Sequence, residues 1–406
     1  MLLSIALILL AGMFTGWLCT RLHLPSLLGM ILTGILLGPF VLNLLDPTIL
    51  TISPDLRKIA LIIILTRAGL TLDLGDLIQV GRPAILLCFV PACFEIGGIV
   101  LLAPKLLGIS VLDAAILGAV LGAVSPAVIV PRMIRLIEQG VATDKGIPQM
   151  ILAGASVDDV FVIVMFTAFT GPAQGESVSA AQFLHIPVSI ALGAALGWAV
   201  GFGMAKFFEH FHMRDTVKVM IFLSLSFLLV TAEDAGAPFS GLIAVMASGI
   251  ALQRQRPKVA VRLSSKFNKL WATAEILLFV LVGATVDPSY AMAAGPKAVL
   301  LILLALVVRS VGVQVCLLGA HLTLKERLFC AVSYLPKATV QAAIGGVPLA
   351  MGLGCGKLVL TVAVLAILIT APLGAFLMDI GADRMIKAEL ARRKLDPSAG
   401  MPMEDD

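Results

Sequence analysis

The chain consists of long apolar runs separated by short polar segments. Each run is close to the ~20 residues that an α-helix needs to cross a bilayer. The pattern therefore predicts an all-α polytopic membrane protein with thirteen transmembrane helices. The predicted spans are 2–20, 25–43, 57–73, 82–103, 110–137, 147–169, 184–207, 216–233, 239–253, 269–286, 297–320, 325–352 and 357–379.

Composition strengthens this prediction and excludes other classes of protein. Of the 406 residues, 59% are hydrophobic and only 13% are charged, whereas soluble domains carry roughly a quarter charged residues. The net charge of +4 comes from short loops and does not indicate nucleic-acid binding. The six cysteines have neither metal-ligand nor disulfide spacing. No phosphate-binding loop or nucleophile elbow is present, so we expect neither an enzyme nor a bound cofactor.

The loops carry their positive charge on one side of the predicted membrane. With the N-terminus outside, 21 of the 29 Lys and Arg residues fall on the inner side and 5 on the outer side. This asymmetry predicts an outer N-terminus and an inner C-terminus. Because no Lys or Arg precedes Arg21, we interpret the first run as a retained span rather than a signal peptide. Residues 384–406 form a polar, partly disordered tail in this interpretation.

Two predicted spans are interrupted in mid-membrane, at Ser125-Pro126 and at Pro336-Lys337. Proline frees backbone carbonyls, which is tolerated at this depth only inside protein or beside a cavity. Each break follows a charged residue at similar spacing, Glu95 in the first half and Arg309 in the second. The sequence thus predicts two inverted six-helix repeats, separated by the seventh span, with two broken crossing helices. Simple proline kinks are the alternative, although the accompanying charges favour a secondary transporter.

Charged residues within the spans are functional candidates, because each costs at least ~2.5–3.5 kcal/mol at the bilayer centre. They comprise three cations and four anions, so one carboxylate is in excess. A transported cation or proton would neutralise that excess. The seven residues are Arg67, Glu95, Asp158, Asp159, Glu275, Arg309 and Lys337.

Asp158 and Asp159 lie near the centre of the sixth span. Consecutive helical residues diverge by ~100°, so the two carboxyl groups point to neighbouring faces. Na⁺ and Li⁺ are small, hard cations that suit oxygen ligands. Asp159, Asp158, the Ser125 hydroxyl and carbonyls freed by Pro126 could supply such ligands, and we expect the cation and the proton to bind here. The alternative is that the two acids cap a helix end.

The other intramembrane charges fall into repeat-related pairs. Glu95 and Arg309 occupy equivalent places, and we interpret them as a structural ion pair, since Arg does not release its proton. Arg67 and Glu275 are interpreted as a second pair. Lys337 at the second break either offsets carbonyl dipoles as a fixed counter-charge or takes part in turnover.

Three segments carry a resemblance to a known family. Ser156-Val157-Asp158-Asp159, the Ser125-Pro126 break and especially residues 335–343, LPKATVQAA, resemble the monovalent cation:proton antiporters with a paired-aspartate motif. The last segment is most similar to the subgroup of SLC9B-type sodium/proton exchangers and their bacterial relatives.

The resemblance implies a homodimer in the plasma (inner) membrane that works by elevator-like alternating access. It implies Asp159 as the principal ligand of Na⁺ or Li⁺ and of H⁺, with Asp158 beside it. It also implies a scaffold/dimer domain, a mobile core transport domain, a linker helix and a cytoplasmic tail. Their ranges are 1–80 and 213–290 for the scaffold, 81–170 and 291–383 for the core, 171–212 for the linker and 384–406 for the tail.

One position departs from the electrogenic bacterial branch, in which a lysine of the equivalent eleventh span pairs with the first aspartate. This chain has Arg309 there, which cannot carry a second proton and favours electroneutral exchange. The main alternative function is a sodium-coupled organic-anion symporter of similar inverted-repeat fold. An intramembrane aspartyl protease would need its acids on different helices, and a channel would need a filter ring that the sequence lacks.

Overall fold

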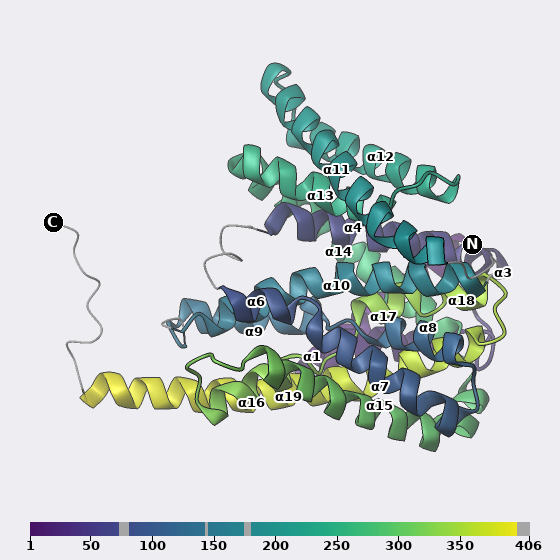
Figure 1. The fold of residues 1–406 in the computed structure, drawn as a ribbon. Coiled ribbons are helices and arrows are strands. Elements are labelled where there is room, and N and C mark those ends of the chain that lie inside the picture. Colours follow the sequence, from purple (N-terminus) through teal and green to yellow (C-terminus); the bar gives the residue numbers. More distant parts are fainter. Residues whose placement is uncertain (73–80, 143–144, 174–179, 396–406) are drawn as a thin grey trace.

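The computed structural model describes residues 1–72, 81–142, 145–173 and 180–395, and these residues form helices and no strands. The helices pack into two groups, and Figure 1 follows the chain through them by colour. The all-helical prediction is therefore confirmed for the described part of the chain.

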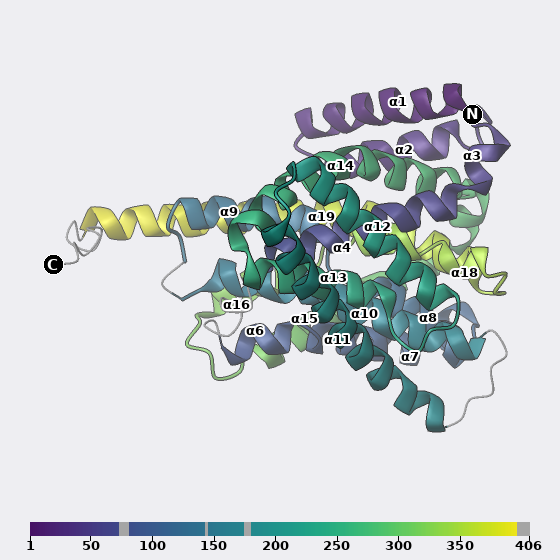
Figure 2. The same cartoon turned by 90° about the horizontal axis from the view of Figure 1, so that it is seen from above.

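The first helix group combines the N-terminal helices with the middle of the sequence. Helices α1, α2, α14, α4, α13 and α11 follow one another as packed neighbours, and α12 packs against α13 and α14. Figure 2 shows α1, α2 and α14 side by side at one edge. The bounds are α1 Leu2–Arg21, α2 Ser26–Leu37, α3 Pro47–Thr51, α4 Ser53–Thr71, α11 Ala180–His210, α12 Asp215–Asp234, α13 Gly241–Gln255 and α14 Pro257–Ala284.

The second helix group holds both interrupted spans. Helix α7 packs against α8 and α15, while α19 contacts α8, α9, α15 and α16. The two groups meet where α17 touches α4 and α14 and where α10 touches α11. The bounds are α6 Arg82–Leu87, α7 Val90–Leu107, α8 Val111–Leu121, α9 Pro126–Glu138, α10 Ile147–Ala173, α15 Pro288–Cys316, α16 Leu324–Ser333, α17 Thr339–Ile344, α18 Val347–Ala350 and α19 Gly356–Leu395.

Nine helical stretches within the described residues are long and apolar enough to cross a membrane, so the chain is a multi-pass membrane protein. They coincide with nine of the thirteen predicted spans. The other four, 25–43, 57–73, 239–253 and 325–352, are occupied by shorter or more polar helices. The count of thirteen and the orientation stay predictions.

Glycine allows helices of the first group to approach closely. A methyl group on Gly34 of α2 would overlap the carbonyl of Val280 on α14, and one on Gly283 would overlap the carbonyl of Ile31. Small residues at helix contacts are typical of membrane proteins, in which dispersion forces between tightly packed helices replace the hydrophobic effect. The α2–α14 contact thus depends on the absence of side chains at Gly34 and Gly283.

We expect Gly34→Ala to destabilise this contact by roughly 1–3 kcal/mol, the usual cost of overpacking. The measurement is the unfolding temperature of the detergent-purified protein, followed by size-exclusion chromatography after heating. Gly97→Ala is the matched control, because a methyl group at Gly97 would meet nothing within 4 Å. Equal unfolding temperatures for the two variants would contradict the prediction.

The C-terminal region differs from the prediction of a polar tail from residue 384. Helix α19 continues to Leu395 and extends beyond the rest of the molecule in Figure 1. The physical reason is local. Residues 384–395 consist almost entirely of good helix formers, and the first proline after them is Pro397, which disfavours helix at the residue before it.

Candidate functional site

The site forms where the two broken spans cross. The first span ends as α8 at Leu121 and resumes as α9 at Pro126, whose ring suits the first position of a helix. Ser125 between them is extended, with φ −93° and ψ 108°. At the second break, residues 334–338 separate α16 from α17. The Ser125 N–H donates to the Pro336 carbonyl at 2.8 Å, so the two breaks are in direct contact.

Side chains bond the backbone groups that the breaks leave without helical partners. The Gln341 amide donates to the carbonyls of Leu121, at 3.3 Å, and Ala123, at 2.9 Å. The Thr370 hydroxyl accepts the N–H of Lys337 at 2.9 Å. A buried backbone group without a partner costs free energy comparable to a lost hydrogen bond. These contacts therefore stabilise the crossing. They also occupy backbone carbonyls beside Pro126, which the sequence analysis considered as possible cation ligands.

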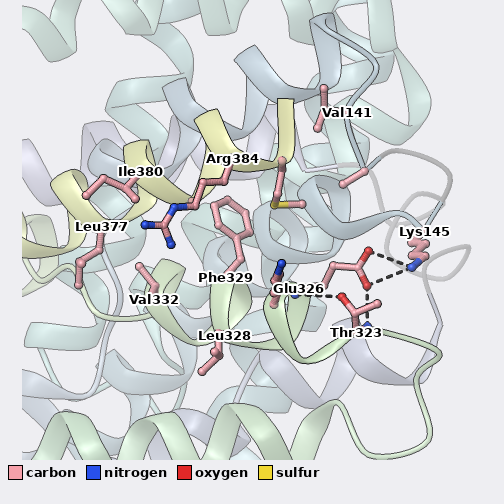
Figure 3. Close-up of a pocket in the computed structure, with 14 residues that line it drawn as sticks. Val141, Lys145, Thr323, Glu326, Leu328, Phe329, Val332, Leu377, Ile380 and Arg384 are labelled. Carbon is pink, nitrogen blue, oxygen red and sulfur yellow. Dashed lines mark hydrogen bonds and ion pairs between the residues drawn. The ribbon is translucent and has the colours of Figure 1, made fainter. Parts of the chain in front are cut away.

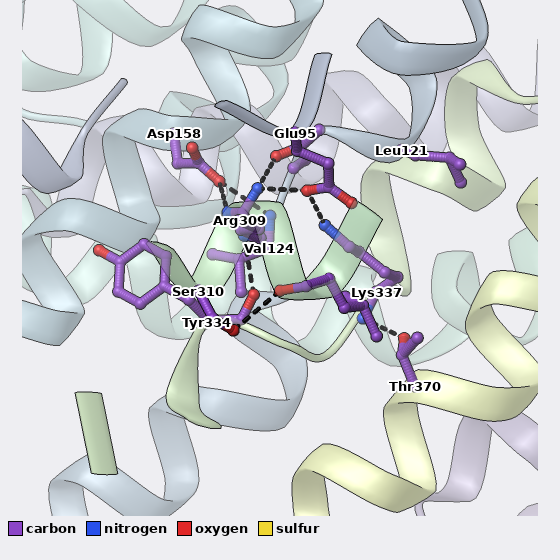
Figure 4. Close-up of polar contacts among 12 residues, drawn as sticks. Glu95, Leu121, Val124, Asp158, Arg309, Ser310, Tyr334, Lys337 and Thr370 are labelled. Atoms are coloured by element: carbon purple, nitrogen blue, oxygen red, sulfur yellow. Dashed lines mark hydrogen bonds and ion pairs between the residues drawn. The ribbon is translucent and has the colours of Figure 1, made fainter. Parts of the chain in front are cut away.

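Four buried charges form one network at the crossing (Figure 4). Arg309 on α15 donates to Glu95 on α7 at 2.7 Å and to Asp158 on α10 at 2.8 Å. Lys337 donates to the same Glu95 oxygen at 2.6 Å. Each of these side chains is at most 2% exposed. Two cations and two anions balance, so the network is electrically neutral.

Arg309 also binds the backbone on both sides of the crossing. Its Nε donates to the Tyr334 carbonyl at 2.8 Å, and one Nη donates to the carbonyl of Gly122. The Val124 N–H donates to Asp158 at 2.9 Å. The charged network and the two backbone breaks are thus parts of a single structure.

Asp159 stands apart from this neutral network. The residue is 7% exposed, and its Oδ1 has no hydrogen-bond partner among the described residues. Five further buried oxygens in the same region also lack a hydrogen-bond partner within the described chain. They are Ser125 Oγ, Asp158 Oδ1, Tyr334 Oη, Thr339 Oγ1 and Gln341 Oε1.

The predicted site residues thus separate into three sets. The first set lies at the crossing and is linked by the contacts described above. Its members are Glu95, Ser125, Pro126, Asp158, Arg309, Pro336 and Lys337. The second set is Asp159 alone, which follows Asp158 on α10. Arg67 and Glu275 lie on packed helices, α4 and α14, and influence each other electrostatically. Within the described chain they form no ion pair at 4.0 Å or less. Sequence reasoning missed the contacts of Gln341 and Thr370. Gln341 lies within the motif at 335–343, which was the available signal.

Among the described residues, the site offers Asp159, a buried carboxylate without an ion pair, and several buried oxygens without a hydrogen-bond partner. Oxygen donors of this kind suit protons and small hard cations. If a proton or a small cation can each neutralise the same carboxylate, the proton and the cation can replace each other there.

Comparisons with known proteins agree with this chemistry. A family model described as "Sodium/hydrogen exchanger, transmembrane" matches residues 5–379. The chain is 35% identical to human (Homo sapiens) sodium/hydrogen exchanger 9B2 over 387 residues, 90% of this chain and 70% of that protein. It is 32% identical to human sodium/hydrogen exchanger 9B1 over 402 residues, 92% and 74% of the two chains.

The fold is similar to that of the sodium proton antiporter MjNhaP1 from Methanocaldococcus jannaschii, solved at pH 8. The TM-score is 0.82 at 20% identity, with 94% of this chain and 97% of that chain covered. The chain therefore belongs to the family of transmembrane sodium/hydrogen exchangers, which are transporters and not enzymes.

Proposed function

We propose that this protein exchanges Na⁺ or Li⁺ for H⁺ at Asp159, with Asp158 and Ser125 as further oxygen ligands. The observation that carries the proposal is the charge balance at the crossing. Glu95 and Asp158 are matched by Arg309 and Lys337, which leaves Asp159 as the excess buried acid. A proton and a small cation would compete for this one carboxylate, and that competition couples their movements.

The packing supports an elevator mechanism. The second helix group carries the crossing, and its contacts with the first group are fewer than those within either group. In the proposal, the second group is the mobile core domain (81–170 and 291–383), and the first group without α11 is the scaffold (1–80 and 213–290). The proposal places α11, in the 171–212 linker, between them. It also includes thirteen spans, an outer N-terminus, an inner C-terminus, a homodimer and a plasma-membrane location.

The contacts of the network favour electroneutral exchange. Arg309 is bound to two carboxylates and two carbonyls, and an arginine keeps its proton at physiological pH. Lys337 donates to Glu95 rather than to Asp158. In this proposal Lys337 is a fixed counter-charge, and a single proton bound at Asp159 exchanges for each cation.

Proton release tests the proposed function directly. We expect that adding NaCl or LiCl to detergent-solubilised protein in weak buffer releases protons, because the cation displaces them from Asp159. The same concentration of choline chloride is the control for ionic strength. A sodium-coupled organic-anion symporter would release no protons, and that result would overturn the proposal.

The stoichiometry needs a second measurement. In proteoliposomes, Na⁺-driven pH change is followed while a K⁺ gradient with valinomycin sets the membrane potential. Electroneutral exchange predicts a rate that does not depend on the potential. A rate that changes steeply with the potential would contradict the fixed role of Lys337.

A further inference from the structure

A cavity lies away from the crossing, at one end of the second helix group. It measures about 750 Å³ and opens between the loop joining α9 to α10, the first turns of α16 and the later turns of α19 (Figure 3). The cavity shares no residue with the proposed cation site. The proposed topology places this end of the protein at the cytoplasmic face of the membrane.

Positive charge is concentrated at the rim of this cavity. Lys145, Lys325 and Arg384 line it, and Glu326 is the only acidic residue among its described lining residues. The Glu326 carboxylate accepts two contacts from Lys145, at 2.9 and 3.0 Å, and one from the Thr323 N–H at 2.7 Å. Its charge is therefore compensated. Lys325 and Arg384 are both exposed, and neither forms an ion pair within the described chain. The rim thus offers two uncompensated cations.

The walls of the cavity are apolar. Along each of the two helices, a basic residue and two apolar residues line the cavity at similar spacing. On α16, Lys325 is followed by Leu328 and Val332, three and seven residues later. On α19, Arg384 is preceded by Ile380 and Leu377, four and seven residues earlier. Residues at these spacings share one helix face. Each helix therefore carries a cation and an apolar stripe about 10 Å long on one face that lines the cavity.

The apolar part continues onto the outer surface of the protein. Leu328 is 54% exposed and the neighbouring Leu324 is 72% exposed. Exposed leucines on a membrane-spanning helix are suited to contact with lipid chains. The cavity thus combines an apolar side that suits acyl chains with a cationic rim that suits a polar headgroup.

We propose that this cavity binds an anionic phospholipid. Its headgroup phosphate lies between Lys325 and Arg384, and an acyl chain lies along Leu328, Val332, Ile380 and Leu377. Charge complementarity selects an anionic headgroup, and basic pockets between transmembrane helices commonly bind such lipids. The apolar stripes select a lipid over a soluble phosphate. The lipid would bridge α16 and α19. The second break follows α16, and Thr370 lies on α19.

The experiment measures lipid binding independently of transport. Detergent-purified protein is titrated with phosphatidylglycerol, phosphatidylcholine, inorganic phosphate or glycerol 3-phosphate, and its unfolding temperature is recorded. Native mass spectrometry then counts the retained lipid molecules. The test variant is Lys325→Gln/Arg384→Gln. The control variant is Lys258→Gln/Lys266→Gln, which removes the same charge from exposed residues of α14 that do not line the cavity.

We expect phosphatidylglycerol, but not phosphatidylcholine, to raise the unfolding temperature of the wild type and of the control variant. The test variant should need a roughly tenfold or higher lipid concentration for the same shift, because each Lys or Arg near a membrane surface contributes about 1 kcal/mol. An undiminished shift in the test variant, or an equal loss in the control variant, would overturn the proposal. Stabilisation by inorganic phosphate or glycerol 3-phosphate alone would also overturn it, in favour of a soluble-anion site.

Discussion

Asp159→Asn should reduce cation-driven proton exchange to the rate of protein-free liposomes. Asparagine has nearly the shape of aspartate, but it neither binds a proton in this pH range nor carries the charge that attracts a cation. No other buried acid at the crossing can replace Asp159, because Glu95 and Asp158 are held by Arg309 and Lys337. The measurement is Na⁺- and Li⁺-driven pH change in proteoliposomes.

The variant should fold normally, which makes its inactivity interpretable. Asp159 Oδ1 has no hydrogen-bond partner within the described structure, so neutralising the side chain breaks no such bond there. The unfolding temperature of Asp159→Asn should equal or exceed that of the wild type. Asp55→Asn, on an exposed first-turn residue of α4, controls for a general effect of losing a carboxylate. Exchange at the wild-type rate by Asp159→Asn would refute Asp159 as the transport site.

Arg309→Ala should have the largest effect on folding. The substitution leaves Asp158 without its cationic partner and removes the donor from the carbonyls of Gly122 and Tyr334. Removing one partner of a buried ion pair costs about 3–5 kcal/mol, because the remaining charge stays buried and uncompensated. We expect loss of most of the monodisperse protein and a much lower unfolding temperature for the remainder.

Two comparisons identify the cause of this instability. Arg262→Ala removes an arginine that is 52% exposed and bound to Asp215, and exposed pairs contribute only about 0–1 kcal/mol. Its stability should stay close to that of the wild type. Adding Asp158→Asn to Arg309→Ala should recover part of the stability, because it removes the uncompensated anion. Wild-type stability of Arg309→Ala alone would show that the network does not hold the crossing together.

The helix interruptions and the buried charges can be predicted from the sequence, because both cost much free energy within a bilayer. Proline at 126 and 336 removes a backbone donor, and each ion within a span needs a partner. These constraints act locally and therefore leave a visible pattern. They allow the residues of the two interruptions to be predicted from the sequence alone.

The identity of each charge's partner could not be predicted in the same way. Which cation contacts Asp158 depends on how α10 and α15 approach, and no local rule fixes that geometry. The sequence therefore suggested a simple Glu95–Arg309 pair, whereas the structure also links Asp158 and Lys337. Arg67 and Glu275 influence each other electrostatically without an ion pair at 4.0 Å or less among the described residues, so their role as a second pair stays a prediction.

Burial of charge near helix ends was also missed. Arg57 is the first residue of the predicted span 57–73, where a charge is expected to face the membrane boundary. In the structure it is 4% exposed, and its guanidinium packs so closely against Gly346 that a methyl group there would overlap it. A count of charges along the chain cannot detect such tertiary packing between α4 and the α17–α18 segment.

The hydrogen bond from the Ser125 N–H to the Pro336 carbonyl has a consequence for evolution. It joins the two interruptions of the chain through their backbones, at positions more than 200 residues apart. A change in the path of the chain at one interruption alters the geometry at the other. The two interruptions are therefore not free to change independently, and a tolerated change at one should require a compensating change at the other.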